Sequence, residues 1–214
     1  MKPDQLSKFT NELTNSKNFE HKPLKNSIIE KFGLYYKAVL KWNEYIPLTT
    51  IIEPVDFAQK HVLESLFAET FIPESVNEIW DIGSGLGVPG IPIAIIRPES
   101  QIFLIEANKK KSIFLKEVIH LLKISNIKVL NARFESLPPF STESCITSRA
   151  LDDLKHLLPK ILASTNNSKL TLLLGTSELL TNTRNFLTSS NRQITTNKIP
   201  KSTDKLIISI SSCT

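Results

Sequence analysis

The feature that most constrains the fold is a cluster of glycines directly after a short apolar segment. Four of the six glycines of the chain lie in the run Asp81-Ile82-Gly83-Ser84-Gly85-Leu86-Gly87-Val88-Pro89-Gly90. Glycine accepts positive φ angles, and the absence of a Cβ lets a ligand approach the backbone. The preceding segment, Glu78–Ile82, is typical of a buried strand. We expect a sharp turn from strand to helix that holds a ligand; a tight turn without a ligand is the alternative.

Strands and helices alternate along the rest of the chain. Strands are expected at residues 78–82, 101–106, 127–130, 144–148, 169–174 and 205–211, and helices at residues 89–96, 108–123, 152–163 and 178–189. In the second of these helices, Asn108 is the expected N-cap, and Ile113, Phe114, Val118, Leu121 and Leu122 form the expected inner face. The alternation predicts an α/β fold with a doubly wound, mostly parallel sheet of the seven-stranded type.

The segment before the first strand has helical character. Residues 1–25 are polar and predict at most one short helix. Apolar residues recur at helical spacing from Asn26, with Asn26 or Ser27 as the cap, and a second helix is expected over residues 55–70, with Pro54 in its first turn. We therefore expect residues 1–70 to be a helical extension that packs on a Rossmann-like domain of residues 71–214, the two forming one structural unit.

A parallel sheet binds ligands at the carboxyl ends of its strands. This rule gathers Asp81–Gly87, Glu106 and Arg133–Glu135 around one crevice. Glu106 ends the second strand, 23 residues after Gly83, where an acid can accept both ribose hydroxyls of an adenosine. An adenosine-containing cofactor fits this pattern, and an exposed acid before a helix is the alternative for Glu106.

The run also contains G-x-G-x-x-G, the dinucleotide pattern, from Gly85 to Gly90. Three observations argue against a nicotinamide cofactor. The run is longer, with Gly83 and the preceding Asp81; Pro89 lacks an N–H that could serve a pyrophosphate; and no other motif suggests a hydride-acceptor site. No G-x-x-x-x-G-K-[ST] motif supports a P-loop.

Composition narrows the class of protein further. The sequence has no apolar run near the roughly 18 residues needed to span a bilayer, and its N-terminus does not resemble a signal peptide. Cys145 and Cys213 are far apart and have no zinc-ligand spacing, which predicts two buried thiols in a reducing cytosol and no metal site. The net charge of +5 is compatible with a polyanionic partner, although most such lysines are simply solvated.

At this point the sequence resembles the bacterial RsmG (GidB) 16S rRNA guanine-N7 methyltransferases. The run Asp81–Ala94 is similar to the family signature D-x-G-x-G-x-x-P-G-x-P. The resemblance covers roughly residues 30–175 and extends to Trp42-Asn43, Leu48-Thr49, Lys60–Leu66, Lys109-Lys110-Lys111, Phe114-Leu115, Arg133-Phe134-Glu135 and Ser148-Arg149-Ala150. There are three departures: Pro47 replaces the usual Asn, Lys60 the usual Arg, and Leu174-Gly175 stands where the family commonly has Lys-Gly.

The resemblance implies a cytoplasmic enzyme that uses S-adenosylmethionine to methylate N7 of a guanine in 16S rRNA of the small ribosomal subunit. It implies that the cofactor contacts Gly83, Gly85, Gly87, Val88, Glu106, Phe134, Glu135 and Arg149. Phe134 and Glu135 are expected beside the adenine, and Arg149 is expected at the mouth of the site, against the methionine carboxylate or RNA.

Candidate RNA contacts are Lys60, His61, Lys109, Lys110, Lys111 and Arg133. For His61 a structural role is the alternative, and for the lysines a solvated charge run is the alternative. Because guanine N7 carries a lone pair and no proton, methyl transfer needs no general base, and we assign no catalytic acid or base and no metal. We expect a monomer. Three other functions remain open: methylation of another substrate, NAD-dependent oxidation and non-catalytic RNA binding.

Overall fold

A computed structural model describes residues 3–15, 23–149, 154–164, 168–188 and 190–212. Its centre is a seven-stranded sheet with the order β3-β2-β1-β4-β5-β7-β6. The strands are β1 (Glu78–Ile82), β2 (Gln101–Ile105), β3 (Ile127–Leu130), β4 (Ser144–Arg149), β5 (Leu170–Thr176), β6 (Arg192–Lys198) and β7 (Lys205–Ser212). The first five strands are parallel, and β7 runs antiparallel to both β5 and β6. The predicted α/β fold is confirmed.

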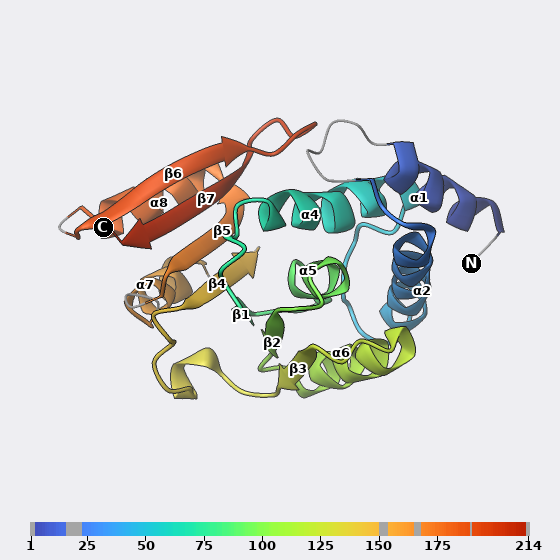
Figure 1. Cartoon of the computed structure of the whole chain (residues 1–214), viewed down its shortest axis with the longest axis horizontal. Helices are drawn as coiled ribbons and strands as arrows, with labels where there is room; N and C mark the ends of the chain where they lie inside the picture. Colours follow the sequence, from blue (N-terminus) through green and yellow to red (C-terminus); the bar gives the residue numbers. More distant parts are fainter. Residues whose placement is uncertain (1–2, 16–22, 150–153, 165–167, 189, 213–214) are drawn as a thin grey trace.

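Helices cover both faces of this sheet (Figure 1). They are α1 (Pro3–Asn15), α2 (Asn26–Asn43), α3 (Pro54–Phe57), the π-helix η1 (Ala58–Leu63), α4 (Glu64–Glu69), α5 (Gly90–Ile96), α6 (Lys109–Leu122), the short 3-10 helix η2 (Phe134–Ser136), α7 (Leu154–Ser164) and α8 (Ser177–Phe186). One continuous core joins the helices from α1 to α6 to one sheet face. Helices α7 and α8 contribute to smaller clusters on the other face.

The helical segment before β1 differs from expectation in two details. Lys25, not Asn26 or Ser27, is the N-cap of α2, and it makes no side-chain capping bond. The helix expected over residues 55–70 begins at Pro54 and contains a central π turn. A π turn shifts the side chains that follow it around the helix axis, a change that apolar periodicity does not encode.

Helix α6 confirms the predicted N-cap but only part of the predicted buried face. Asn108 is its N-cap, as expected, and its Oδ1 accepts hydrogen bonds from the backbone N–H groups of Lys110 and Lys111. The expected inner face was wrong at two positions, since Ile113 and Leu121 are 47% and 45% exposed. The buried stripe contains Phe114, Leu115, Val118 and Leu122, and the two exposed residues lie off that stripe.

No strand was expected at the position of β6. This edge strand is polar, and most of its side chains are exposed or half-buried. It is ordered by backbone pairing with β7 rather than by burial of an apolar face. Two smaller expectations concern residues outside the described ranges: the first two residues of the helix expected at 152–163, and the thiol of Cys213. Cys145 is buried and is not in a disulfide.

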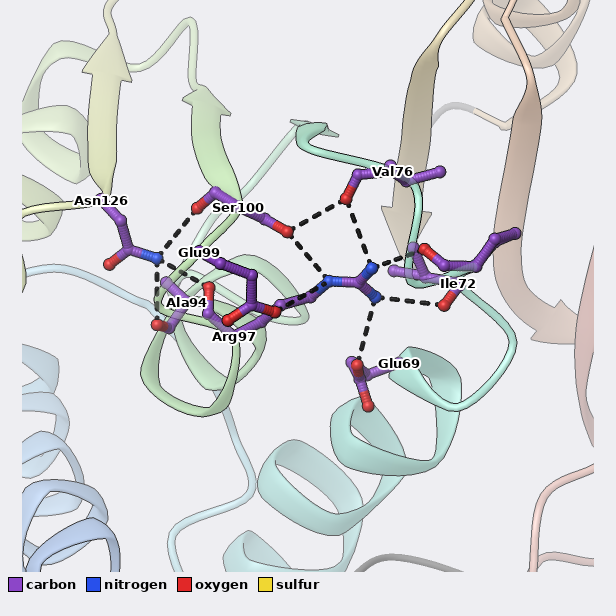
Figure 2. Close-up of polar contacts among 9 residues, drawn as sticks. Glu69, Ile72, Val76, Ala94, Arg97, Glu99, Ser100 and Asn126 are labelled. Atoms are coloured by element: carbon purple, nitrogen blue, oxygen red, sulfur yellow. Dashed lines mark hydrogen bonds and ion pairs between the residues drawn. The ribbon is translucent and has the colours of Figure 1, made fainter.

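Arg97 joins the turn after α4 to the start of β2 (Figure 2). Because it precedes β2, it lies at the amino ends of the parallel strands, whereas the glycine run lies at their carboxyl ends. The Arg97 side chain is 4% exposed, yet its guanidinium donates to Glu69, to Ser100 and to the carbonyls of Ile72, Pro73 and Val76. A buried charge is tolerated when its donors are satisfied in this way. Arg97 therefore anchors the segment that links the helices to the sheet.

Candidate functional site

The glycine run forms the turn between β1 and α5, at the carboxyl ends of the parallel strands. Its backbone is fixed from outside, because the N–H groups of Gly83 and Ser84 both donate to the carbonyl of Ile105 at the end of β2, at 3.0 and 3.1 Å. Gly87 has a φ of 97°, and a Cβ there would lie 2.4 Å from Cδ1 of Ile91. This position therefore requires glycine to close the turn against α5.

Gly85 favours glycine through its backbone conformation and not through packing. Its φ is 56°, but a Cβ at this position would meet no atom closer than the carbonyl oxygen of Gly83, at 3.8 Å. The backbone here therefore borders open space rather than packed core. Such a surface suits close approach by a ligand.

Glu106 follows β2 and faces the same turn, as the strand-end rule predicts. Its side chain is 8% exposed, and its two carboxylate oxygens accept hydrogen bonds from the backbone N–H of Gly85 at 2.8 Å and of Asn108 at 2.7 Å. Asn131, after β3, donates to the Glu106 carbonyl. The carboxylate is thus fixed in orientation, and each oxygen retains a lone pair that can accept a hydroxyl.

Asp81 is the penultimate residue of β1, beneath the turn, and is fully buried. Burial raises the pKa of this carboxyl from 3.8 to about 6. The charge of Glu106 acts in the same direction. Hydrogen bonds to the carboxylate, such as the one from Thr147 Oγ1 at 3.1 Å, oppose this shift. A second buried polar side chain, Tyr35 of α2, donates to the carbonyl of Leu86 at 2.8 Å. Helix α2 therefore supports the turn directly.

The segment after β3 contributes a buried ring and two exposed charges. Phe134 is 7% exposed and packs in a cluster with Ile82 and Ile105, the last residues of β1 and β2. The carboxylate of the neighbouring Glu135 lies 3.5 Å from Lys160 Nζ of α7, and Arg133 is exposed. The expected cofactor residues after β3 therefore lie beside the ends of β1 and β2.

Arg149, at the end of β4, belongs to a charged cluster that we call the Glu64 cluster, made of Glu64, Arg149 and Lys205. Arg149 Nη2 lies 3.2 Å from Glu64 Oε2, and Lys205 Nζ lies 2.8 and 3.1 Å from the two Glu64 oxygens. Arg149 Nη1 is buried and has no hydrogen-bond partner among the described residues. Desolvation lowers the pKa of Arg149, and the Glu64 charge opposes that effect.

Sheet register places Leu174 on the same sheet face as Lys205. Leu174 is buried and in register with Arg149 on β4 and with Ile207 on β7. Lys205 precedes Ile207 by two positions, so its side chain lies on the same sheet face. A cation therefore reaches this face from β7, although position 174 is apolar.

His61 of η1 is 4% exposed. Its Nε2 lies 3.0 Å from Thr49 Oγ1, its ring stacks edge-on against Phe57, and its Nδ1 is buried without a partner among the described residues. Burial, and then the charges of Arg149 and Lys205, lower the His61 pKa to about 3, so the ring is neutral at pH 7. Its expected contact with RNA stays a prediction.

The motif Trp42-Asn43 with Leu48-Thr49 organises the loop that holds this histidine. Asn43 Oδ1 accepts hydrogen bonds from the N–H groups of Leu48 and Thr49, and Asn43 Nδ2 donates to the Thr49 carbonyl. The loop is thereby closed on the end of α2. Pro47 lies inside it without disturbing these bonds.

The expected basic contacts are divided between two places. Lys109 and Lys110 are exposed and Lys111 half-buried at the first turn of α6, directly after Glu106, and the exposed Arg133 follows β3 at the same sheet edge. Lys60 lies on η1 and pairs with Asp56 at 2.9 Å. The first group borders the glycine turn, whereas Lys60 belongs to the helical segment before β1.

Three residues of the site were missing from the sequence-based set. Tyr35 was indistinguishable from an ordinary core aromatic, and Lys205 from a solvated lysine. Glu64 carried one signal, because it interrupts an apolar helix within the segment Lys60–Leu66. Among the described residues, no group of histidine, cysteine and acidic side chains could hold a metal ion, and no helix is long and apolar enough to cross a membrane.

Comparison with known proteins adds to this geometry. The family model GidB, described as rRNA small subunit methyltransferase G, matches residues 28–207. The chain belongs to the GidB family. This match contains the whole glycine turn, Glu106 and the Glu64 cluster, and leaves α1 outside it.

One curated relative is the ribosomal RNA small subunit methyltransferase G of Dichelobacter nodosus, which is 40% identical to this chain over 136 residues. The matched segment is 64% of this chain and 64% of that relative, so the chain spans less than two thirds of the relative's length.

Among solved structures, the chain resembles a precorrin-6y C5,15-methyltransferase from Geobacter metallireducens, with a TM-score of 0.58 and 16% identity over 80% of this chain and 95% of that one. It also resembles M. jannaschii TYW2 in complex with AdoMet, with a TM-score of 0.52 and 14% identity over 72% and 75% of the two chains. These likenesses establish the fold of this GidB-family chain.

Proposed function

We propose that this chain is an S-adenosylmethionine-dependent methyltransferase that methylates N7 of a guanine in 16S rRNA of the small ribosomal subunit. The observation that carries the proposal is the fixed pair formed by the Gly85 N–H and the Glu106 carboxylate, in a member of the GidB family. The name of its relative, a ribosomal RNA small subunit methyltransferase, supports the choice of substrate.

The residues of the turn fit an adenosine-containing cofactor. Glu106 is oriented by two backbone N–H groups and keeps lone pairs for two ribose hydroxyls. Gly83 and Gly85 supply backbone that a ligand can approach, while the buried Gly87 and Val88 are proposed as cofactor contacts from the family resemblance. Phe134 and Glu135 are our candidates to flank the adenine. Arg149 has a buried Nη1 for the methionine carboxylate.

When bound, the cofactor supplies an electrophilic methyl group. The chain itself binds and orients. Guanine N7 attacks with its own lone pair and loses no proton, so no side chain has to remove one. Ordering of two reactants alone is worth up to about 7–11 kcal/mol. This requirement agrees with a site in which no acid–base pair has been assigned.

For RNA we propose contacts at Lys109, Lys110, Lys111 and Arg133, which border the glycine turn, and at Lys60 and His61. Lysine and arginine neutralise phosphates and make the affinity dependent on salt. His61 is buried and lies 3.0 Å from Thr49 Oγ1, so its part in RNA binding is proposed to be support of the Thr49 loop. We further propose a cytoplasmic monomer in which residues 1–70 are an extension on the domain of residues 71–214.

The decisive experiment is transfer of a labelled methyl group from S-adenosylmethionine to purified small ribosomal subunits that lack the modification. We expect the labelled methyl group in 16S rRNA, attached to N7 of a guanine. Incorporation into a protein or small molecule instead would move the substrate to another class, and cofactor binding without any transfer would favour a non-catalytic RNA-binding protein.

Calorimetry with S-adenosylhomocysteine and with NADH separates the cofactor alternatives. We expect binding of S-adenosylhomocysteine only. Binding of NADH alone would reject the methyltransferase proposal and support an oxidoreductase.

A further inference from the structure

The Glu64 cluster carries more charge than a neutral ion pair. Its members come from three distant segments, α4, β4 and β7, and the side chains of Glu64 and Arg149 are 6% and 11% exposed. With one acid and two bases, the three side chains of the cluster sum to +1; the charge of the nearby Asp81 carboxyl, whose pKa is about 6, also reaches Arg149. Burial of a net charge is unfavourable unless a counter-ion or further hydrogen bonds compensate it.

Within the cluster, Arg149 is held on one side only. Its Nη2 faces Glu64, while its Nη1 is buried and has no partner among the described residues. The other neighbours do not supply an anion to it as directly. His61 is neutral at pH 7. Asp81, whose charge reaches Arg149, forms no ion pair with it among the described residues; Thr147 donates to its Oδ1, and its Oδ2 is buried without a hydrogen-bond partner there.

Lys205 determines whether the cluster is neutral or positive. Both Glu64 oxygens are within 3.1 Å of its Nζ, so Lys205 balances the Glu64 charge that Arg149 would otherwise balance. Without Lys205, Glu64 and Arg149 would form a neutral pair with little attraction for an anion. With Lys205, whose side chain is 32% exposed, the cluster offers the buried Arg149 Nη1 as a donor and one positive charge in excess of the Glu64 charge.

We propose that Glu64 and Lys205 are positioning residues: Glu64 orients the Arg149 guanidinium, and Lys205 leaves the cluster net positive for the carboxylate of the cofactor's methionine part. This inference rests on the proposed function. The low exposure of Arg149 favours a small carboxylate over an RNA phosphate, because the exposed Lys109 and Lys110 are much more accessible to a polymer.

The test uses two ligands that differ in the group in question. S-adenosylhomocysteine carries the carboxylate, whereas 5′-methylthioadenosine has the same adenosine without the amino-acid part. For Lys205→Met, calorimetry should show about tenfold weaker binding of S-adenosylhomocysteine and unchanged binding of 5′-methylthioadenosine. Lys205→Arg should restore most of the affinity.

A charge-balanced double variant tests the mechanism. Glu64→Gln keeps an oxygen that can accept from Arg149, and combined with Lys205→Met it returns the cluster to +1. We expect the double variant to bind S-adenosylhomocysteine more tightly than Lys205→Met alone. No recovery would overturn the role of net charge.

Lys198→Met is the matched control. Lys198 is exposed on β6 and in register with Leu206, so it lies one position away on the opposite sheet face and its loss removes the same formal charge. Its affinity for both ligands should equal that of the wild type.

The remaining outcomes are each decisive. Equal loss of both ligands in Lys205→Met would reduce Lys205 to a structural residue. Unchanged S-adenosylhomocysteine binding with weaker binding of a 16S rRNA fragment would assign the charge to RNA and overturn the inference. Failure of the wild type to bind S-adenosylhomocysteine would reject the proposed function itself. If the wild type binds it and Lys205→Met binds it equally well, only this inference is rejected.

Discussion

At the scale of single residues, Gly85 and Gly87 have different structural roles in the same turn. Gly87 faces Ile91 and Leu115 and closes the turn onto the core, whereas Gly85 borders open space and presents its N–H to Glu106. A substitution at the first position therefore disturbs packing, and one at the second disturbs the ligand-facing surface.

We predict that Gly85→Asp abolishes binding of S-adenosylhomocysteine while the protein stays folded. A left-handed φ costs a non-glycine residue about 1 kcal/mol, and aspartate tolerates it better than most. The new carboxylate would stand beside Glu106 and repel it. Calorimetry and thermal melting measure the two effects, with Gly85→Ala as the control for backbone strain alone. An unchanged affinity would show that this face of the turn does not meet the ligand.

Asp81 leads to a prediction about pH. The pKa of this buried carboxyl is about 6 in the folded chain against 3.8 ordinarily, so the folded state holds the proton more tightly. Its contribution to stability is therefore most favourable below about pH 4 and declines as pH rises to about 6. Since a shift of one pKa unit corresponds to about 1.36 kcal/mol, ionisation of Asp81 lowers the unfolding free energy by on the order of 3 kcal/mol at neutral pH.

Asp81→Asn should remove that cost and keep an oxygen that accepts from Thr147. Relative to wild type, we expect the variant to gain about 3 kcal/mol more unfolding free energy at pH 8 than at pH 4. Urea unfolding at both pH values measures the difference, with the exposed Glu44→Gln as a control for loss of one negative charge. A gain that does not vary with pH would contradict the assigned cause.

At the scale of elements, the Arg97 anchor determines how the helical segment is attached. The carbonyls of Ile72, Pro73 and Val76 all accept from this one side chain, so its removal leaves several buried acceptors without a donor. Glu69 would also lose its cation.

We predict that Arg97→Met lowers the unfolding free energy by about 3–5 kcal/mol, the usual cost of breaking a buried charge network. The affinity of the folded fraction for S-adenosylhomocysteine should stay within about twofold, because Arg97 lies at the amino ends of the parallel strands. Arg133→Met, at an exposed position, should change stability by no more than about 0.5 kcal/mol. Similar unfolding curves for the two variants would mean that the network contributes little.

Local signals explain which elements could be predicted from sequence. Asn108 was a correct cap because the capping bond spans only two or three residues. The phase of α6 was partly wrong, since an apolar residue next to the buried stripe, such as Ile113, is compatible with either face. Strand β6 was missed because its order comes from β7, and its own polar sequence gives no apolar pattern.

At the scale of the whole molecule, the sheet topology could be predicted from the sequence. Contacts between side chains that are far apart in the sequence could not. The strand-end rule correctly brought Glu106 to Gly85, which are 21 residues apart, because it follows from the parallel topology. No comparable rule joins Glu64 to Lys205, 141 residues apart, since that contact depends on the antiparallel insertion of β7 beside β5.

The position of β7 has a consequence for a chain that emerges from the ribosome in sequence order. β7 lies between β5 and β6, so β6 has no pairing partner in the sheet until β7 has been synthesised. The glycine turn, Glu106 and Arg149 all precede Lys205 in time as well as in sequence. Because Lys205 belongs to β7, the three-residue Glu64 cluster can form only after β7 has been synthesised and inserted beside β5.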